Sequence, residues 1–342
     1  MLRSRIGSGL HVGRNFMRMK AFMSASGFVS KDCNRSTMRR TPDRFSFWSK
    51  RDCATPPRLL TGVLALAAAM VVAMAVPARA QHPITPPATS APPAVRPITL
   101  ASHRAVYKVT LVRASQADGV RSAFGSTTYT LTDRCDGYTI ESALHLELGL
   151  ANGSDSTLEQ RYAAWEAKDN RSASFRMLSH ENDSLKDSYH GTVTLDANGA
   201  GSAVYNNDQD DKPVTYDLPA GTLLSTAHTA ALLAAAAHDE RLVNRAVIDG
   251  SFDDGPYRIA AVISAPQHGV LPVADSRGLE SGPVRPMALA YYALESSDDA
   301  PQYELSMSLY PNGVARHMVQ DFGGFTLAFE LVHVEPVTGP SC

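Results

Sequence analysis

The stretch Ala105–Val112 reads AVYKVTLV, and its pattern recurs through most of the chain that follows. Tyr107, Val109 and Leu111 stand at every second position, with a Lys or a Thr between them. Because successive side chains of a strand point to opposite faces, this period of two predicts a β-strand with one buried face. The turn signal Asp118-Gly119 follows within a few residues and predicts that the chain reverses there.

Twelve further runs of this kind follow, separated by turn signals such as Asn198-Gly199, Asn312-Gly313 and Gly323-Gly324. With the first run, the expected strands cover residues 105–112, 123–132, 138–148, 157–167, 172–178, 185–195, 201–205, 245–252, 257–265, 284–293, 303–309, 314–322 and 325–334. Short alternating runs joined by such turns predict a mainly β fold with antiparallel neighbours. A sheet of about 12 to 14 strands does not stay flat, so we expect an open spiral or barrel-like sheet.

One segment breaks the strand pattern. Residues 222–240 (TLLSTAHTAALLAAAAHDE) are rich in Ala and Leu and contain no Gly or Pro. Ala and Leu favour helices, so this segment predicts the one main α-helix, with Ser225 or Thr226 as its N-cap. Its small apolar residues suit a helix that packs against a curved sheet. The alternative is a helix on a membrane surface, but the segment lacks the basic face of such helices.

An export signal precedes the expected sheet. Residues 59–80 (LLTGVLALAAAMVVAMAVPARA) form an apolar run that follows a basic leader and ends in a small-x-small motif. This combination predicts a secretory signal peptide, cleaved between Ala80 and Gln81, and hence a periplasmic protein. The alternative is a retained transmembrane anchor, although Pro77 and Arg79 leave the run marginal for a span of about 20 residues. Because Gln81 is not a cysteine, we expect no lipid anchor and no membrane attachment after cleavage.

The charge distribution separates the leader from the rest of the chain. Residues 1–58 carry 13 basic and 3 acidic side chains, whereas residues 81–342 carry 18 basic and 31 acidic ones. An acidic exported part argues against nucleic acid as a partner, because nucleic-acid binders need a basic face. Residues 81–99 contain six prolines and almost no charge, which predicts an extended linker. The expected organisation is a leader with its signal (1–80), the linker, and a single β domain (100–342).

Two of the four cysteines, Cys135 and Cys342, remain after the expected cleavage. In an oxidising compartment, two thiols in one chain predict a disulfide; free or intermolecularly paired thiols are the alternative. A bridge that closes so long a loop stabilises the fold by about 5 kcal/mol at most in the chain-entropy picture. Neither cysteine belongs to a C-x-x-C motif, which argues against a redox enzyme.

Motifs for catalysis and metal binding are missing. The sequence contains no G-x-S-x-G, no H-E-x-x-H and no Gly-rich phosphate loop after a strand. Residues 208–211 (DQDD) suggest calcium, but they lack the glycine and the distal glutamate of a calcium loop, which favours a solvated hairpin tip. His228 and His238 lie on different helical turns and not at ligand spacing, and His103, beside Arg104, is interpreted as a hydrogen-bonding residue at a strand edge. We expect no cofactor and no metal.

Several motifs occur in a characteristic order and spacing. They are SHRAVY (102–107), Tyr129 followed by CDGY (135–138), TAHT (226–229), PNGVAR (311–316), DFGGF (321–325) and the final Cys342. Together they resemble the EipB-like cell envelope integrity proteins of alphaproteobacteria, over roughly residues 100–342.

The resemblance implies a periplasmic protein built as an open, spiralling β-barrel with a helix against it, similar to lipoprotein-carrier folds that hold lipid in a concave sheet. It implies a disulfide between an early and a late cysteine, positions that Cys135 and Cys342 match. Members of the family support envelope homeostasis under stress, and no enzymatic activity is established for them. The motif positions carried over are His103, Arg104, Tyr107, His228, Asn312, Gly313 and Asp321.

These observations favour a non-enzymatic periplasmic protein, expected to be a monomer, that supports envelope integrity. It would bind a lipid or an extended peptide, or contact an envelope protein, through the concave face of its sheet. The aromatic residues are expected to fill the core, a minority of them lining an apolar groove; they are Tyr107, Tyr129, Tyr138, Trp165, Phe322 and Phe325. Two alternatives stay open: an interaction module without a ligand cavity, and an uncharacterised hydrolase that uses the region of His103 or His228.

Overall fold

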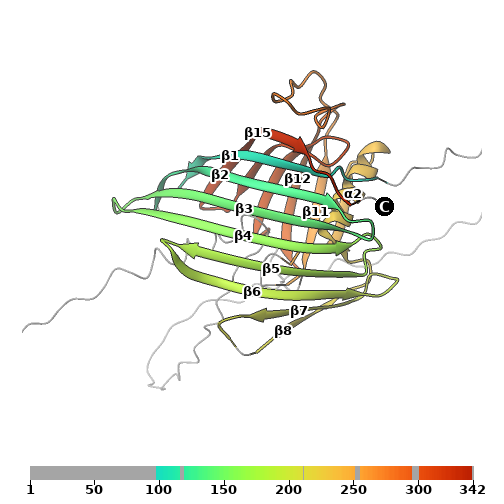
Figure 1. Ribbon diagram of the computed structural model, residues 1–342, viewed down its shortest axis with the longest axis horizontal. Coiled ribbons are helices and arrows are strands. Elements are labelled where there is room, and N and C mark those ends of the chain that lie inside the picture. The colour runs from blue at the N-terminus through green and yellow to red at the C-terminus, as the bar shows by residue number, and fades with distance from the viewer. Residues whose placement is uncertain (1–97, 116–118, 211, 251–254, 295–299, 341–342) are drawn as a thin grey trace, which may run out of the picture. The chain divides into compact units, whose positions relative to one another are not determined.

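The computed structural model describes residues 98–115, 119–210, 212–250, 255–294 and 300–340. Within these ranges, fifteen strands form one sheet, and one helix, α2 (Ser225–Ala237), packs against it (Figure 1). The strands are β1 (His103–Ala114), β2 (Val120–Asp133), β3 (Gly137–Leu150), β4 (Asp155–Ala167), β5 (Ser172–Glu181), β6 (Ser184–Leu195), β7 (Gly201–Asn207), β8 (Val214–Leu218), β9 (Leu223–Leu224), β10 (Leu242–Ile248), β11 (Tyr257–Ile263), β12 (Arg285–Ala293), β13 (Tyr303–Leu309), β14 (Ala315–Asp321) and β15 (Phe325–Pro336).

The sheet consists of two meanders joined in its middle. Its order is β8-β7-β6-β5-β4-β3-β2-β1-β15-β14-β13-β12-β11-β10-β9, so the first strand pairs with the last. All the neighbouring pairs are antiparallel except β9 with β10, which is parallel. The edges β8 and β9 do not pair with each other, so the sheet is not closed into a barrel. The prediction of a mainly β, open, barrel-like antiparallel sheet with one helix is confirmed.

The predicted strands recur with shifted ends, and two strands were missed. β8 is short and largely exposed, and β9 consists of two residues that the prediction assigned to the helix. The strand predicted for 245–252 begins earlier, at Leu242, and ends at Ile248. The turn prediction holds at Gly199 and Gly313, where φ is +77° and +89°, values that glycine adopts without steric cost.

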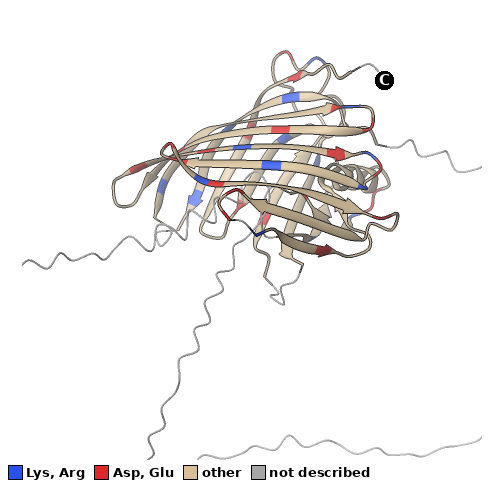
Figure 2. Ribbon diagram, turned by 60° about the horizontal axis from the view of Figure 1, so that its bottom comes forward, with Lys and Arg blue, Asp and Glu red and all other residues tan. Residues whose placement is uncertain are grey.

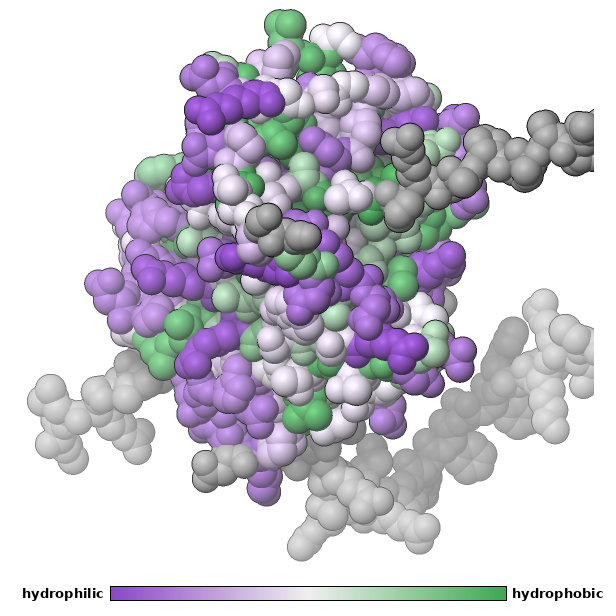
Figure 3. Space-filling view, turned by 45° about the vertical axis from the view of Figure 1, so that its right-hand side comes forward, coloured by the Kyte–Doolittle hydropathy of each residue, from purple (hydrophilic) through white to green (hydrophobic). Residues whose placement is uncertain are grey.

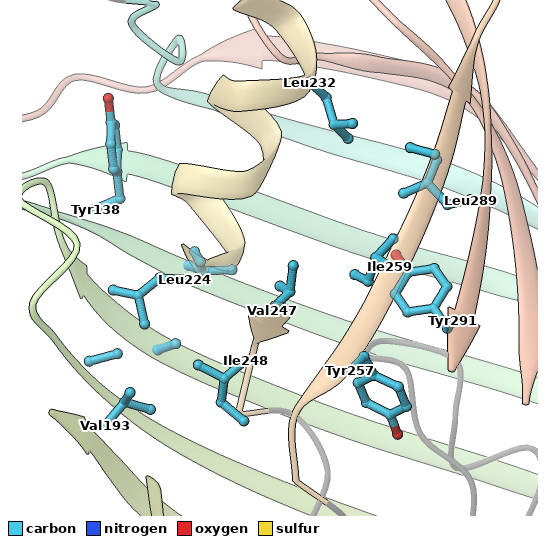
Figure 4. Close-up of a cluster of buried hydrophobic side chains, with 14 of the residues drawn as sticks. Tyr138, Val193, Leu224, Leu232, Val247, Ile248, Tyr257, Ile259, Leu289 and Tyr291 are labelled. Carbon is cyan, nitrogen blue, oxygen red and sulfur yellow. The ribbon is translucent and has the colours of Figure 1, made fainter. Parts of the chain in front are cut away.

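The two meanders curl so that their inner faces oppose each other. Figure 1 shows β1–β6 passing across β11 and β12, and the buried side chains of both halves meet between them. One core cluster joins Val193 of β6 to Ile259 of β11 and to Leu232 of α2 (Figure 4). A second cluster joins Leu146 of β3 to the strand β15. The fold thus has two apolar cores under one curled sheet.

The helix begins later than predicted. It spans Ser225–Ala237 and its N-cap is Leu224, which makes no side-chain capping bond, so the assignment of Ser225 or Thr226 as the N-cap is wrong. The preceding Leu223–Leu224 is held extended because it pairs with the end of β10, and because the Leu224 N–H donates to Asn170 Oδ1 at 2.8 Å. Tertiary pairing therefore overrides the helix propensity of these leucines. The helix packs on β9, β10 and β11.

Charged residues are spread along the strands and at their turns (Figure 2). Along β4, for example, Glu159 and Arg161 are exposed while Leu158, Gln160 and Tyr162 are buried. Figure 3 shows hydrophilic side chains over much of one side of the domain, with smaller hydrophobic areas between them. Of the aromatic residues expected in the core, Trp165 is the exception, because it takes an outward position on β4 and is only half-buried.

Several predictions fall outside the described residues. The leader, the signal peptide with its cleavage site at Ala80 and Gln81, and all but the last two residues of the linker lie in the part that precedes residue 98. Cys342 also lies outside the described ranges. Within those ranges, no helix combines the length and the hydropathy that a membrane crossing requires.

Candidate functional site

A cavity of about 260 Å³ lies between the two meanders. β1, β2 and β12–β15 form its walls, and the first turn of α2 contributes to one part of it. Tyr129 of β2 and Ala315 of β14 line the cavity and pack against both core clusters. The cavity is therefore the place where the two cores meet without filling the space between them.

The walls on β13 and β14 are largely apolar, with Gln320 and the Tyr303 hydroxyl as their polar groups. Met307 and Met318 are cross-strand partners, and Leu305 is the next inward residue on β13. These side chains share the inner face with the buried Tyr303 and Leu309, yet each remains partly exposed. The surface they leave exposed belongs to the cavity, because native cores are otherwise packed without such gaps.

Two side chains of β1 from the predicted motif set line the cavity. His103 is buried; its Nδ1 lies 2.7 Å from the Ala101 carbonyl oxygen, and its ring lies 5.8 Å from that of Tyr129. Burial lowers the pKa of His103, so the imidazole is neutral at neutral pH. The Tyr107 hydroxyl donates to the Ala315 carbonyl at 2.9 Å and so connects β1 to β14.

The turn between β13 and β14 supplies a third motif residue. Gly313 lines the cavity at φ +89°, a backbone conformation that favours glycine. Asn312 fixes the turn: its Nδ2 donates to the Leu279 carbonyl at 2.8 Å, and its Oδ1 accepts the Val314 N–H at 3.2 Å.

The N-terminus of α2 forms a polar end of the cavity, and it is held by a buried carboxylate. Ser225 and Thr226 line the cavity, and Glu166 of β4 lies behind them. Ser225 Oγ donates to Glu166 Oε1 at 2.6 Å; the Thr226 N–H and hydroxyl donate to Oε2 at 2.8 and 2.6 Å. Burial raises the pKa of Glu166, and these hydrogen bonds oppose the rise. Glu166 thus accepts the hydrogen bonds of donors at the start of α2 for which the N-cap residue provides no side-chain acceptor.

A second carboxylate, Asp249, lines the cavity directly after β10. Its backbone carbonyl accepts the Tyr162 hydroxyl at 2.5 Å. Burial raises the pKa of Tyr162 and of Tyr291, and the negative charge of Asp249 raises both further. Likewise burial, followed by the charge of Glu166, raises the pKa of Tyr129. The phenols around this end of the cavity therefore experience a negative potential.

The other motif residues lie away from the cavity. Arg104 is exposed and faces Glu335 at 3.5 Å. Asp321 accepts two hydrogen bonds from the Arg113 guanidinium, at 2.9 and 3.1 Å, and one from the Gly323 N–H. The Arg104 contact connects β1 to the far end of β15, and the Asp321 contacts connect β1 to the β14–β15 turn, so the two residues have structural roles.

His228 is buried in α2 and is not part of the cavity wall. Its Nε2 has no hydrogen-bond partner among the described residues. Burial, followed by the positive charge of Arg245, lowers the pKa of His228 to about 4.

The sulfur of Cys135 is engaged in a disulfide. Its predicted partner, Cys342, lies outside the described residues, so the pairing itself stays a prediction. The chain just before that residue does run beside the β2–β3 turn. The Val337 N–H donates to the Ser102 carbonyl at 3.3 Å, and a Cβ at Gly339 would lie 2.4 Å from the Asp133 carbonyl oxygen.

Residues 208–210 of the DQDD segment are exposed between β7 and β8, and Asp211 lies outside the described residues. The Asp208 carboxylate accepts from Ser188, from His190 at 2.9 Å and from Arg176 at 3.2 Å. No group of three or more His, Cys, Asp or Glu within the described ranges has a geometry that would hold a metal ion.

Glu166 and Asp249 were missed by the sequence analysis. Glu166 did carry a signal, because it follows the buried Leu158 and Tyr162 at an even position and so extends the inward face of β4 with an acidic residue. Asp249 carried none, because it follows its strand and no alternation fixes its direction. The cavity wall of Leu305, Met307 and Met318 could not be told from ordinary core.

The chain was compared with known proteins. The sequence pattern of the EipB-like family matches residues 94–338. The cell envelope integrity protein EipB of Brucella abortus (strain 2308) is 25% identical over 253 residues, which cover 72% of this chain and 87% of that protein. A crystal structure from Brucella abortus, described as a beta-barrel-like protein of domain of unknown function DUF1849, superposes with a TM-score of 0.62 at 24% identity. The match covers 70% of this chain and all of that one.

The family pattern spans β1 to β15 and includes every wall of the cavity. The curled sheet agrees with the fold of the Brucella structure. This chain belongs to the EipB-like family.

Proposed function

We propose that this protein is a non-enzymatic periplasmic factor that supports the integrity of the cell envelope by binding an apolar ligand in the cavity between its two cores. The name of the Brucella relative supports the envelope role, and the signal-like segment at residues 59–80 supports the periplasm. The observation that carries the binding proposal is the cavity itself, with its methionine and leucine walls.

The size and lining of the cavity suit a single hydrocarbon chain or a small ring system. An engineered apolar cavity of about 150 Å³ takes up benzene. The cavity here, at about 260 Å³, is larger and is largely apolar along β13 and β14. Burying apolar ligand surface there contributes about 25 cal/mol for each Å² removed from water.

Neither alternative function has comparable support. An interaction module would need no cavity between the cores. A hydrolase would need a nucleophile and a base that both contact the substrate, yet Glu166, which accepts from the Ser225 and Thr226 hydroxyls, lies behind these residues and also accepts the Thr226 N–H in capping α2. The name of the Brucella relative refers to envelope integrity and not to a reaction.

Filling the cavity tests the proposal. Met307→Trp adds an indole to the wall, whereas Met307→Leu conserves the side-chain volume and is the matched control. The neutral dye N-phenylnaphthylamine should fluoresce with the wild-type protein and with Met307→Leu, and at least about tenfold more weakly with Met307→Trp, a loss of roughly 1.4 kcal/mol in binding. Unchanged dye binding by a folded Met307→Trp variant would contradict cavity binding.

The envelope role has its own test. Deletion of the gene should sensitise cells to detergent and to cell-wall antibiotics, and the Met307→Leu variant should restore resistance while Met307→Trp should not. If both variants restored resistance equally, the envelope role would not depend on binding in the cavity.

A further inference from the structure

Five hydroxyl groups that line the cavity donate their protons to the protein. Among the lining residues, the Tyr107 hydroxyl donates to Ala315 O, that of Thr127 to Ala143 O at 3.1 Å, and that of Thr229 to Ser225 O at 3.0 Å. Ser225 and Thr226 donate to Glu166, as described above. A hydroxyl has one proton but two acceptor lone pairs, so these five groups offer acceptors and not donors to a ligand.

The charges around the cavity have the same sign. Asp249 is a carboxylate in the wall, and Glu166 is a buried carboxyl directly behind Ser225 and Thr226. No Lys or Arg occurs among the described residues that line the cavity, and the one lining histidine, His103, is buried against a carbonyl oxygen.

The nearest positive features are both neutralised. The positive charge of Arg316 acts on the Tyr107 hydroxyl and opposes the rise in its pKa. Arg316 also forms an ion pair with the buried Glu280 at 3.4 Å. The N-terminus of α2 would otherwise attract an anion. Its Thr226 N–H already donates to Glu166 Oε2, so a carboxylate of the protein occupies that position.

We propose that the ligand of this cavity is a single-chain amphiphile whose polar end is a primary ammonium group, and that amphiphiles with an anionic end are excluded. The inference rests on the proposed function. The hydrocarbon chain lies against Met307 and Met318, and the ammonium group donates to Asp249 and to the free lone pairs of Ser225 and Thr229. A carboxylate or phosphate end finds no positive counter-charge among the described lining residues, lies near the like charge of Asp249, and is therefore costly to desolvate.

Three amphiphiles with the same chain, namely decylamine, decanol and decanoate, test the proposal by displacement of N-phenylnaphthylamine near neutral pH. Decylamine should bind at least about tenfold more tightly than decanoate, with decanol between them. Equal or tighter binding of decanoate would overturn the inference and leave the proposed function intact. If neither the dye nor any of the three binds, the proposed function itself fails.

Asp249→Asn tests the charge. It should reduce the preference for decylamine over decanol to within about threefold while decanol binding stays unchanged, which also reports that the cavity has folded. Glu304→Gln removes the same charge from an exposed position on β13 and is the matched control. A preference that survives Asp249→Asn, or one that Glu304→Gln removes equally, would contradict the assignment. Ser225→Ala gives a second variant, which should weaken decylamine more than decanol.

The ammonium group is also found on lysine side chains. An apolar tripeptide with a C-terminal lysine amide is therefore included as a competitor. It should displace the dye less effectively than decylamine, and stronger displacement by the peptide would overturn the assignment to a single-chain amine.

Discussion

At the scale of single residues, Glu166 joins the sheet to the helix. It accepts three hydrogen bonds from the first residues of α2 while it lies fully within the protein. A buried carboxylate is favourable only when its acceptor sites are occupied, and a buried donor without an acceptor is costly. The cap that the sequence suggested at Ser225 or Thr226 is therefore provided from β4, a relation that only the folded chain reveals.

Replacing Glu166 with Ala should lower the free energy of unfolding by about 2 kcal/mol or more, because the Ser225 and Thr226 donors lose their acceptor. Urea unfolding followed by circular dichroism measures this. Glu159→Ala, on the exposed face of the same strand with only the exposed His145 as its ion-pair partner, should cost less than about 1 kcal/mol. Equal losses in the two variants would disprove the capping role.

His228 should make the fold sensitive to acid. Its pKa is about 4 in the folded protein and about 6.5 when unfolded, so the unfolded state binds the proton first as the pH falls. The neutral His228 contributes fully to the free energy of unfolding above about pH 6.5. This contribution falls as the pH drops toward the folded-state pKa, and about 2 kcal/mol is lost by about pH 5. Unfolding of His228→Leu across this range should show a shallower decline. The exposed His238→Leu is the control, and an identical slope in all three proteins would refute the assignment.

At the scale of elements, strand alternation was readable because one face of each long strand is buried. β3 and β4 show it almost without interruption. It failed for β8, which is exposed on most of its residues, and for β9, whose two leucines have no alternation to display. The helix was identified from its composition, but its first residue depends on the pairing of β9 with β10, which is not local in sequence.

The β2–β3 pair contains a glycine that the sheet cannot replace. A Cβ at Gly125 would lie 2.0 Å from the His145 carbonyl oxygen and 2.9 Å from Leu146 Cα, both of them backbone atoms. No side-chain rotation relieves such a contact. Gly125→Ala should therefore destabilise the protein by about 1–3 kcal/mol in urea unfolding, whereas Ser126→Ala, at the exposed neighbouring position, should change stability by less than about 0.5 kcal/mol. If Gly125→Ala left the free energy of unfolding unchanged, β2 and β3 would have to be farther apart than described.

At the scale of the whole domain, the fold was predictable and the cavity was not. Strand count and turn signals require a sheet that curls, and curling brings two inner faces together. Whether those faces fill the space between them depends on the sizes and directions of side chains from distant strands. Leu305 and Met318 have the same residue types as true core positions, so nothing in their sequence context marks them as cavity wall.

The predicted Cys135–Cys342 bridge would act on the entire domain, because it would close nearly all of it into one loop. The oxidised protein should show no thiol reactive toward maleimide after the expected cleavage. Cys135→Ser should lower the melting temperature by several degrees, because the unfolded chain gains entropy worth about 5 kcal/mol at most. Cys342→Ser should have the same effect, and the double variant should be no worse than either. Equal melting with and without reductant would count against the bridge.

Pairing of β1 with β15 has a consequence for how the chain folds. As an exported polypeptide emerges into the periplasm, each hairpin from β1 to β8 can pair with the one before it, but the other edge of β1 stays unpaired until β15 has emerged. During that interval one edge of β1 has unpaired backbone N–H and C=O groups. Such edges pair readily with strands of neighbouring molecules and so favour aggregation. The incompletely folded protein is therefore most prone to aggregate just before β15 pairs with β1. A chaperone that protects it has to remain bound until that pairing has formed.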